Sequence, residues 1–334
     1  MHPALQGLLT IGIGVSGCVG YFYFSNIVLD KYIFPARGAN AGRNINRANM
    51  VRPWLFLLPA MLALGIYLVY PVFETLRLSV TERTNTGYDF VGLANYGQML
   101  SESKFWEAMR NNMLWLIVVP ALSTAFGLLA AQLTDRIRWG NIAKSLIFMP
   151  MAISFVGAAV IWKLVYDTRP EGQDQIGLLN ALYIFFGGDA PQAWITLPFW
   201  NNFFLMIVLV WIQTGFAMVI LSAALRGIPE ETVEAAIVDG ANPLQIFFKI
   251  KVPQIKATIL VVWTTITITV LKVFDIVFAM TNGQWQTQVL ANYMYDKMFR
   301  ANDWGAGSAA AMVIMLLVMP ILVWNVKNAR EEMR

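Results

Sequence analysis

Charged residues and metal-binding side chains are scarce in this 334-residue sequence. Only 13% of the residues are charged, and there is one histidine and one cysteine. This composition cannot supply a disulfide or the His/Cys clusters that hold structural zinc. The sequence also lacks the G-x-x-x-x-G-K-[ST] phosphate-binding loop and the G-x-S-x-G nucleophile elbow. We therefore expect no bound cofactor, no catalytic centre and no ATP hydrolysis by this chain itself.

Apolar residues are abundant instead. They make up 57% of the sequence, and the mean hydropathy is +0.56. Such a chain needs lipid around it, which predicts an all-α, multi-pass integral membrane protein. Seven apolar runs are long enough, or nearly so, to cross a hydrocarbon core of about 30 Å as helices. The runs are Ala4 to Leu29, Pro53 to Leu76, Met113 to Leu133, Ser145 to Trp162, Phe203 to Leu225, Ala257 to Met280 and Ala306 to Val326.

An eighth apolar segment, residues 176–200, is interrupted by the sequence GGDAP at residues 187–191. Neither half is long enough to cross a bilayer. Its aromatic residues Tyr183, Trp194 and Trp200 are of the kind enriched at headgroup level. We expect this segment to lie at the membrane interface.

Positive charge is distributed unevenly between the connections of the seven runs. The connections after the first run and before the sixth are rich in basic residues, among them Lys31, Arg43, Lys249 and Lys251, and the intervening connections hold fewer. The positive-inside rule therefore places the N-terminus outside and the C-terminus in the cytoplasm. The net charge of +4 fits this orientation, and no basic face with interleaved aromatic residues indicates nucleic-acid binding.

The cytoplasmic loop before the sixth run contains EAAIVDGANPLQIFFKIKVP, residues 234–253. Two acidic residues at 230–231 suit the positive end of a helix dipole, and Gly240 suits a helix end. Asn-Pro at 242–243 can cap and start a second helix that stops near Pro253. The loop is predicted to be a bent helical pair that projects from the membrane, although an amphipathic linker on the membrane surface is the alternative.

The spacing of this loop resembles the EAA motif of ABC importer permeases. The residues proposed for coupling are Glu234, Ala235, Ala236, Asp239, Gly240, Ile250 and Pro253, and Val252 stands where leucine is more usual. In that family the loop docks into a cleft of a separate ATP-binding subunit, which holds the ATP and magnesium. Residues 56–80, 90–112 and 273–283 resemble the carbohydrate branch of these permeases, with weaker similarity to alpha-glucoside permeases.

This resemblance implies a six-helix type I permease domain at residues 52–334, with the coupling loop at about 226–256. Residues 1–51 would add one N-terminal transmembrane helix and a basic cytoplasmic connection. The implied function is ATP-driven import of an oligosaccharide or alpha-glucoside. The implied partners are a second permease subunit, two ATP-binding subunits and an external solute-binding protein, all at a bacterial inner membrane.

The sixth run carries polar residues on one helical face. Thr265, Thr269 and Lys272 follow at i, i+4 and i+7, where they could meet a hydroxylated solute. A lysine at bilayer depth is costly unless it is paired or hydrated, so Lys272 either serves the solute path or forms an ion pair with Asp275. The sequence leaves both interpretations open.

The fifth run adds Gln213 and Phe216, an amide and an aromatic face of the kind that bind sugar hydroxyls and C–H surfaces. The predicted substrate path therefore consists of Gln213, Phe216, Thr269 and Lys272. Positions that match the sugar-contacting ones of the resembled family also include the apolar residues Ile212, Ile266, Val270 and Val273. A secondary transporter for a small polar solute and an ABC permease for a non-sugar solute are the alternatives.

Overall fold

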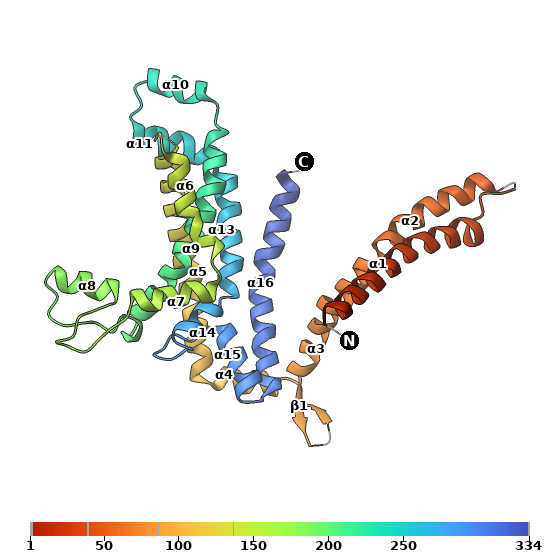
Figure 1. Ribbon diagram of the computed structural model, residues 1–334, viewed down its shortest axis with the longest axis horizontal. Coiled ribbons are helices and arrows are strands. Elements are labelled where there is room, and N and C mark those ends of the chain that lie inside the picture. Colours follow the sequence, from red (N-terminus) through yellow and green to blue (C-terminus); the bar gives the residue numbers. More distant parts are fainter. Residues whose placement is uncertain (1–2, 39, 86, 136, 333–334) are drawn as a thin grey trace. The chain divides into compact units, whose positions relative to one another are not determined.

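The structure is a computed structural model that describes residues 3–38, 40–85, 87–135 and 137–332 (Figure 1). It is mostly helical and divides into two compact units, Met1–Glu74 and Thr75–Arg334.

Five helices in the described part of the chain are long and apolar enough to cross a membrane. Two further helix pairs are strongly bent, so the number of crossings rises to seven if each pair counts as one. The five are Leu5–Ile33, Ala41–Ser79, Ser103–Thr134, Trp200–Arg226 and Trp304–Trp324. The multi-pass helical prediction is confirmed, and the count of seven and the orientation remain predictions.

The first unit consists of two long helices connected at residues 34–40. Helix α1 (Pro3–Val28) continues into the π-type turn η1 (Leu29–Ile33). The second helix comprises α2 (Ala41–Leu64), the π-type segment η2 (Gly65–Val69) and the start of α3 (Tyr70–Ser79).

Two polar contacts fasten α1 and η1 to α2. The Tyr21 hydroxyl donates to the Leu55 carbonyl at 2.8 Å, and Arg52 pairs with Asp30 at 2.7 Å. The second crossing was predicted to begin at Pro53, but the helix already begins at Ala41. Arg43, predicted in a connection, therefore lies on this helix. The sequence supplies too few helix-breaking residues between 41 and 53 to end it.

After the last residues of α3, the second unit forms a short β-hairpin, a small departure from the all-α prediction. Strands β1 (Thr81–Thr84) and β2 (Gly87–Phe90) are antiparallel, with Thr81 opposite Phe90. Helix α4 (Ala94–Ser101) follows. The buried Asn95 amide donates to the Thr81 carbonyl at 2.9 Å and thereby holds α4 to the hairpin.

Helices α5 (Ser103–Thr134) and α9 (Trp200–Arg226) form the centre of the second unit. Their contact is close because Gly127 has no side chain: a Cβ atom there would lie 2.4 Å from the Cβ of Ala217. Trp115 and Leu209 are fully buried in the core that these helices share with α13 (Lys256–Leu271). The predicted third and fifth crossings are confirmed as long helices.

The predicted fourth crossing, Ser145 to Trp162, is not one continuous helix. Helix α6 (Gly140–Phe148) passes through a 3₁₀ turn, η3 (Met149–Ala152), into α7 (Phe155–Val165), and the two arms differ by 105° (Figure 1). Pro150 cannot donate a backbone hydrogen bond. Ser154 then starts α7 afresh, because its hydroxyl accepts from the Gly157 amide at 3.1 Å.

The predicted sixth crossing, Ala257 to Met280, is also wrong as one helix. Helix α13 ends at Leu271, and α14 (Asp275–Met280) is separate. Phe274 lies between them with φ −138° and ψ −57°, outside helical values. Helix α14 packs against α7 and α9 and does not continue α13.

Residues 176–200 contain no helix of spanning length, as expected. Helix α8 (Leu178–Phe185) and the turn η4 (Trp194–Thr196) are the helical parts of this segment. The buried Asn180 side chain donates to the Gln192 carbonyl at 3.0 Å and accepts from the Gln192 amide at 2.8 Å. The chain ends in α15 (Leu290–Tyr295), η6 (Asp296–Arg300) and α16 (Trp304–Glu332), which contains the predicted seventh crossing.

Candidate functional site: a bent helical loop and an anchored loop at the opposite end

The predicted coupling loop projects from one end of the second unit. Helices α14 and α15 lie at the opposite end (Figure 1). The first arm of the loop is α10 (Glu230–Val238), and the second arm is a continuous helical stretch of α11 (Pro243–Gln245), the π-type η5 (Ile246–Lys251) and α12 (Val252–Gln254).

Gly240 makes the bend between the two arms. Its φ is +79°, in the left-handed region that favours glycine. The Gly240 amide donates to the Ile237 carbonyl at 3.0 Å, and the Ala241 amide donates to the Ala236 carbonyl at 2.9 Å. These bonds satisfy the last carbonyls of α10, as in a glycine-terminated helix. The prediction that Gly240 ends the first helix is confirmed.

The second arm starts with a reciprocal cap. Asn242 Oδ1 accepts from the Gln245 amide, and Gln245 Oε1 accepts from the Asn242 amide, both at 2.9 Å. Pro243 stands at the first helical position, where no amide hydrogen is needed. Pro253 lies in α12, and the arm ends at Ile255. The predicted bent helical pair is confirmed.

The loop buries few of its residues and exposes several large apolar side chains. Ala236 and Ile246 are buried, and Ile250 is half-buried. Val238 is 86% exposed and Leu244 is 69% exposed. The other large exposed apolar side chains on the loop are Ile237 and Phe248. Several large exposed apolar side chains on one loop are typical of a protein-binding site.

The remaining motif residues lie on the accessible side of the loop. Glu234, Ala235, Asp239 and Pro253 are exposed. A cavity of about 540 Å³ lies behind α10, and Glu230, Glu234 and Lys251 line it together with the end of α9. The carboxylate of Glu234 is therefore available to a basic partner group.

A polar cluster ties the base of this loop to the rest of the unit. The Asp135 carboxylate accepts from Arg226 at 3.0 Å and from the Ser222 hydroxyl at 3.0 Å, and it pairs with Lys144. Burial alone would raise the pKa of the Asp135 carboxyl, but these hydrogen bonds outweigh it and hold the pKa below its ordinary value. The cluster joins α5, α6 and α9. Sequence reasoning missed it.

The four predicted path residues lie on two neighbouring helices. Gln213 is buried on α9, and Phe216, half-buried, packs against the apolar core. Thr269 is half-buried on α13, and its hydroxyl donates to the Thr265 carbonyl at 3.1 Å. Lys272 is exposed directly after α13.

The four path residues are not brought into direct contact by hydrogen bonds. Neither a hydrogen bond between any two of them nor an ion pair between Lys272 and Asp275 is present, and all five residues are within the described part of the chain. The matched apolar positions Ile212, Ile266, Val270 and Val273 are buried in the core. The solute path therefore remains a prediction.

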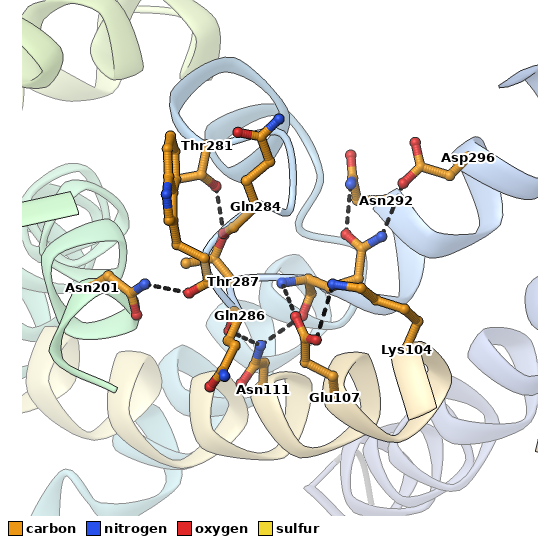
Figure 2. Close-up of polar contacts among 12 residues, drawn as sticks. Lys104, Glu107, Asn111, Asn201, Thr281, Gln284, Gln286, Thr287, Asn292 and Asp296 are labelled. Carbon is orange, nitrogen blue, oxygen red and sulfur yellow. Dashed lines mark hydrogen bonds and ion pairs between the residues drawn. The ribbon is translucent and has the colours of Figure 1, made fainter. Parts of the chain in front are cut away.

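A loop that sequence reasoning missed, residues 281–289, lies at the end opposite the coupling loop. Four of its residues have positive φ: Asn282, Gly283, Trp285 and Gln286. Such backbone is costly for residues other than glycine, so the surrounding structure must hold it. Figure 2 shows the side chains that do so.

Two asparagine pairs at the starts of long apolar stretches supply most of these anchors. Asn111 donates to the carbonyls of Gln286 and Gln288 at 2.9 and 2.8 Å, and Asn201 donates to the Trp285 carbonyl at 2.6 Å (Figure 2). Their neighbours contribute as well: Asn112 accepts from the Leu290 amide and Asn202 donates to the Gln286 carbonyl. The Thr281 and Thr287 hydroxyls lie 2.6 Å apart across the loop. The repeated Asn-Asn dipeptide before two apolar runs was the available sequence signal.

Comparison with known proteins places the chain among membrane transport subunits. A family described as "Binding-protein-dependent transport system inner membrane component" matches residues 123–327. The alpha-glucoside transport system permease protein AglF of Rhizobium meliloti (strain 1021) is 65% identical over 99% of both chains. The osmoprotective compounds uptake permease protein GgtC of Synechocystis sp. is 48% identical over 84% of this chain and 100% of that one.

A solved structure shares the fold. It is the crystal structure of a bacterial ABC transporter involved in the import of the acidic polysaccharide alginate. It matches with a TM-score of 0.72 and 19% identity, and the match covers 86% of this chain and 98% of that one. Together with the family match over residues 123–327, these relatives show that the chain belongs to the inner membrane components of binding-protein-dependent transport systems, the permease subunits of ABC importers.

Proposed function

We propose that this chain forms part of the translocation path of an ATP-driven importer for a neutral sugar, an oligosaccharide or an alpha-glucoside. The observation that carries the proposal is the coupling loop, whose motif residues form a bent helical pair with an exposed apolar apex. A bend fixed by Gly240 and by the Asn242 cap suits a rigid element that transmits motion. A surface linker would need no such fixed shape.

The sugar assignment draws on the relatives as well as the residues. The relative with 65% identity is named as an alpha-glucoside permease, and a lactose permease of Rhizobium radiobacter is 28% identical over 86% of this chain. The amide of Gln213 and the ring of Phe216 are groups that bind hydroxyl and C–H surfaces of sugars. These observations support a carbohydrate over an ion or an amino acid.

The working assembly would contain a second permease subunit, two ATP-binding subunits and an external solute-binding protein, in a bacterial inner membrane. ATP and magnesium would sit in the ATP-binding subunits. The coupling loop would face the cytoplasm, with the N-terminus outside, the C-terminus inside and seven crossings. The solved complex of the alginate transporter with an alginate pentasaccharide-bound periplasmic protein supports an external binding protein as a partner.

Uptake by the complete transporter in proteoliposomes tests this function. Radiolabelled maltose, sucrose and trehalose would be offered with the external binding protein, and ATP would be enclosed in the vesicles. We expect import of at least one disaccharide that requires ATP and continues when an ionophore collapses the ion gradients. Import that follows the ion gradient without ATP would instead identify a secondary transporter, and import of none of the sugars would refute the sugar assignment.

A further inference from the structure

We propose that a polar cavity at the end opposite the coupling loop is an outer binding site for one neutral pyranose ring of the imported sugar. This inference rests on the proposed function, because it assigns that function a second site on this chain. The cavity encloses about 400 Å³. Small-molecule sites usually measure roughly 300–1,000 Å³, so a sugar ring is of suitable size.

Planar polar side chains and charged groups line this cavity. They include Glu102, Gln284, Gln288, Asp296, Lys297 and Arg300. Amides, carboxylates and guanidinium groups together offer donors and acceptors on several sides, which is what a ring carrying several hydroxyl groups requires. The Gln284 side-chain amide makes no hydrogen bond within the described residues and is available to a ligand.

The charges in the cavity compensate one another. Arg300 pairs with Asp296 at 2.9 Å, and Lys297 pairs with Glu102. Lys104, which also lines the cavity, pairs at 3.2 Å with Glu107, which does not. Each cation therefore already has a carboxylate partner. An anionic sugar would have to displace one of these carboxylates, so the site favours a neutral ligand over a uronic acid.

An aromatic surface adjoins the cavity at Arg300. The Arg300 guanidinium lies 5.7 Å from the Phe278 ring centre and 5.8 Å from that of Tyr295. The ring centres of Phe278 and Tyr295 are 5.2 Å apart, and Tyr295 and Phe299 are 5.1 Å apart. Phe299 is 59% exposed. Aromatic faces beside polar groups complement the two kinds of surface of a pyranose ring.

The aromatic surface leads toward the predicted solute path. Phe274 stacks on Phe278, with their ring centres 4.9 Å apart. Phe274 lies in the break after α13, two residues from Lys272. At the other end Phe299 contacts Trp304 at 5.6 Å. A series of five rings, each in contact with the next, therefore connects the break at Lys272 with the outer end of the unit. A sugar held in the cavity would have an aromatic surface along which to move inward.

The cavity wall is rigid before any ligand arrives. One side is the positive-φ loop 281–289, held by Asn111 and Asn201 (Figure 2). Gln288 is fixed between neighbours, since its amide donates to Asp296 at 2.9 Å and its oxygen accepts from Asn292 at 2.6 Å (Figure 2). A preformed site loses less conformational entropy when the ligand binds.

The test compares uptake by the complete transporter carrying Gln284→Ala or Tyr295→Ala with the unaltered transporter. Maltose, or whichever tested disaccharide the unaltered transporter imports, is the probe. Losing one neutral hydrogen bond or one ring contact is expected to raise the sugar concentration for half-maximal uptake by about fivefold. The maximal rate and the recovery of the second permease subunit should stay unchanged. Phe186→Ala, which removes an 81% exposed ring directly after α8, is the matched control.

A third variant tests the role of charge. Asp296→Asn keeps an acceptor for Gln288 but leaves Arg300 without its carboxylate. Glucuronate, which should not inhibit uptake by the unaltered transporter, should inhibit this variant. Unchanged half-maximal concentrations in both alanine variants would overturn the outer site, as would loss of the second permease subunit, because the cavity would then be a subunit contact. An unaltered transporter that imports no sugar would refute the proposed function and this site with it.

Discussion

Arg226 donates to the Asp135 carboxylate from Nε at 3.1 Å and from Nη2 at 3.0 Å, and so links the last residue of α9 to the residue after α5. The coupling loop leaves the membrane domain only four residues later, at Glu230. Any force on the loop therefore reaches α5 through a charged contact as well as through α9. Lys144 joins the same carboxylate from α6, so three helices share one anchor.

Asp135→Asn should lower the stability of the second unit. It removes the counter-ion of Lys144, whose side chain is only 14% exposed, and we expect a loss of about 1–3 kcal/mol in unfolding free energy. Thermal unfolding in detergent measures this change. Asp189→Asn, at an exposed loop position, serves as the control and should leave the melting temperature unchanged.

The same pair of proteins should show a defined pH dependence. The pKa of Asp135 is lower in the folded than in the unfolded protein. The stabilisation that Asp135 contributes is therefore fully present above the unfolded pKa and is lost as the pH falls through the folded pKa. The difference in melting temperature between unaltered protein and Asp135→Asn should therefore be constant at neutral pH. It should shrink as pH is lowered through and below about 3.9. A difference that grows on acidification would contradict this assignment.

Substitutions at Gly240 should separate backbone conformation from bulk. A Cβ atom at this position meets no other atom within 4 Å, so only the φ of +79° opposes a side chain. Asparagine adopts the left-handed backbone region readily, whereas a β-branched residue is destabilised there by about 1–2 kcal/mol. Gly240→Val should lose the ATP-binding subunit during copurification, and Gly240→Asn should retain it. Equal behaviour of the two variants would show that the bend is unimportant.

Lys272→Met should reduce sugar uptake by at least about tenfold while leaving subunit assembly intact, a loss of about 1.4 kcal/mol. The lysine is exposed directly after α13, at a break in a predicted crossing, where ionisable groups usually serve transport. Lys163→Met, in the last turn of α7, makes the same change at another helix end and should have little effect. Normal uptake with Lys272→Met would favour a purely structural role for this lysine.

Membrane orientation can be measured with single cysteines, since Cys18 is the only native one. In a Cys18→Ser background, Val238→Cys and Phe186→Cys place thiols at positions 86% and 81% exposed. An impermeant maleimide should label Phe186→Cys in right-side-out vesicles and Val238→Cys only in inside-out vesicles. Labelling of both from one side would show that the orientation inferred from the basic residues is wrong.

The coupling loop could be predicted from sequence because its structure is encoded locally. Gly240, Asn242 and Pro243 each determine backbone geometry within a few residues, whatever the rest of the chain does. The long apolar helices were predictable for a similar reason, since lipid requires their backbone hydrogen bonds to be internal.

The broken crossings and the outer loop could not be predicted in the same way. Pro150 and Ser154 lie at the first break, but the apolar run continues across them, so hydropathy alone predicted one crossing. The break at Lys272 has no glycine or proline beside it, and the packing of α14 on α7 sets its position. The side-chain amides of Asn111 and Asn201, next to long apolar runs, need hydrogen-bond partners. Those partners lie more than 80 residues away in the sequence. Only the folded chain brings these groups together.

The most direct measurement of the central claim is a cross-link from the apex of the coupling loop. Val238→Cys in the Cys18→Ser background would be labelled with benzophenone maleimide in the assembled transporter and illuminated, with Phe186→Cys as the control. The account predicts a covalent adduct between Val238→Cys and the ATP-binding subunit, and none from Phe186→Cys. Adducts of Val238→Cys with lipid alone, in a transporter that retains its ATP-binding subunits, would contradict the claim that this loop couples the chain to ATP hydrolysis.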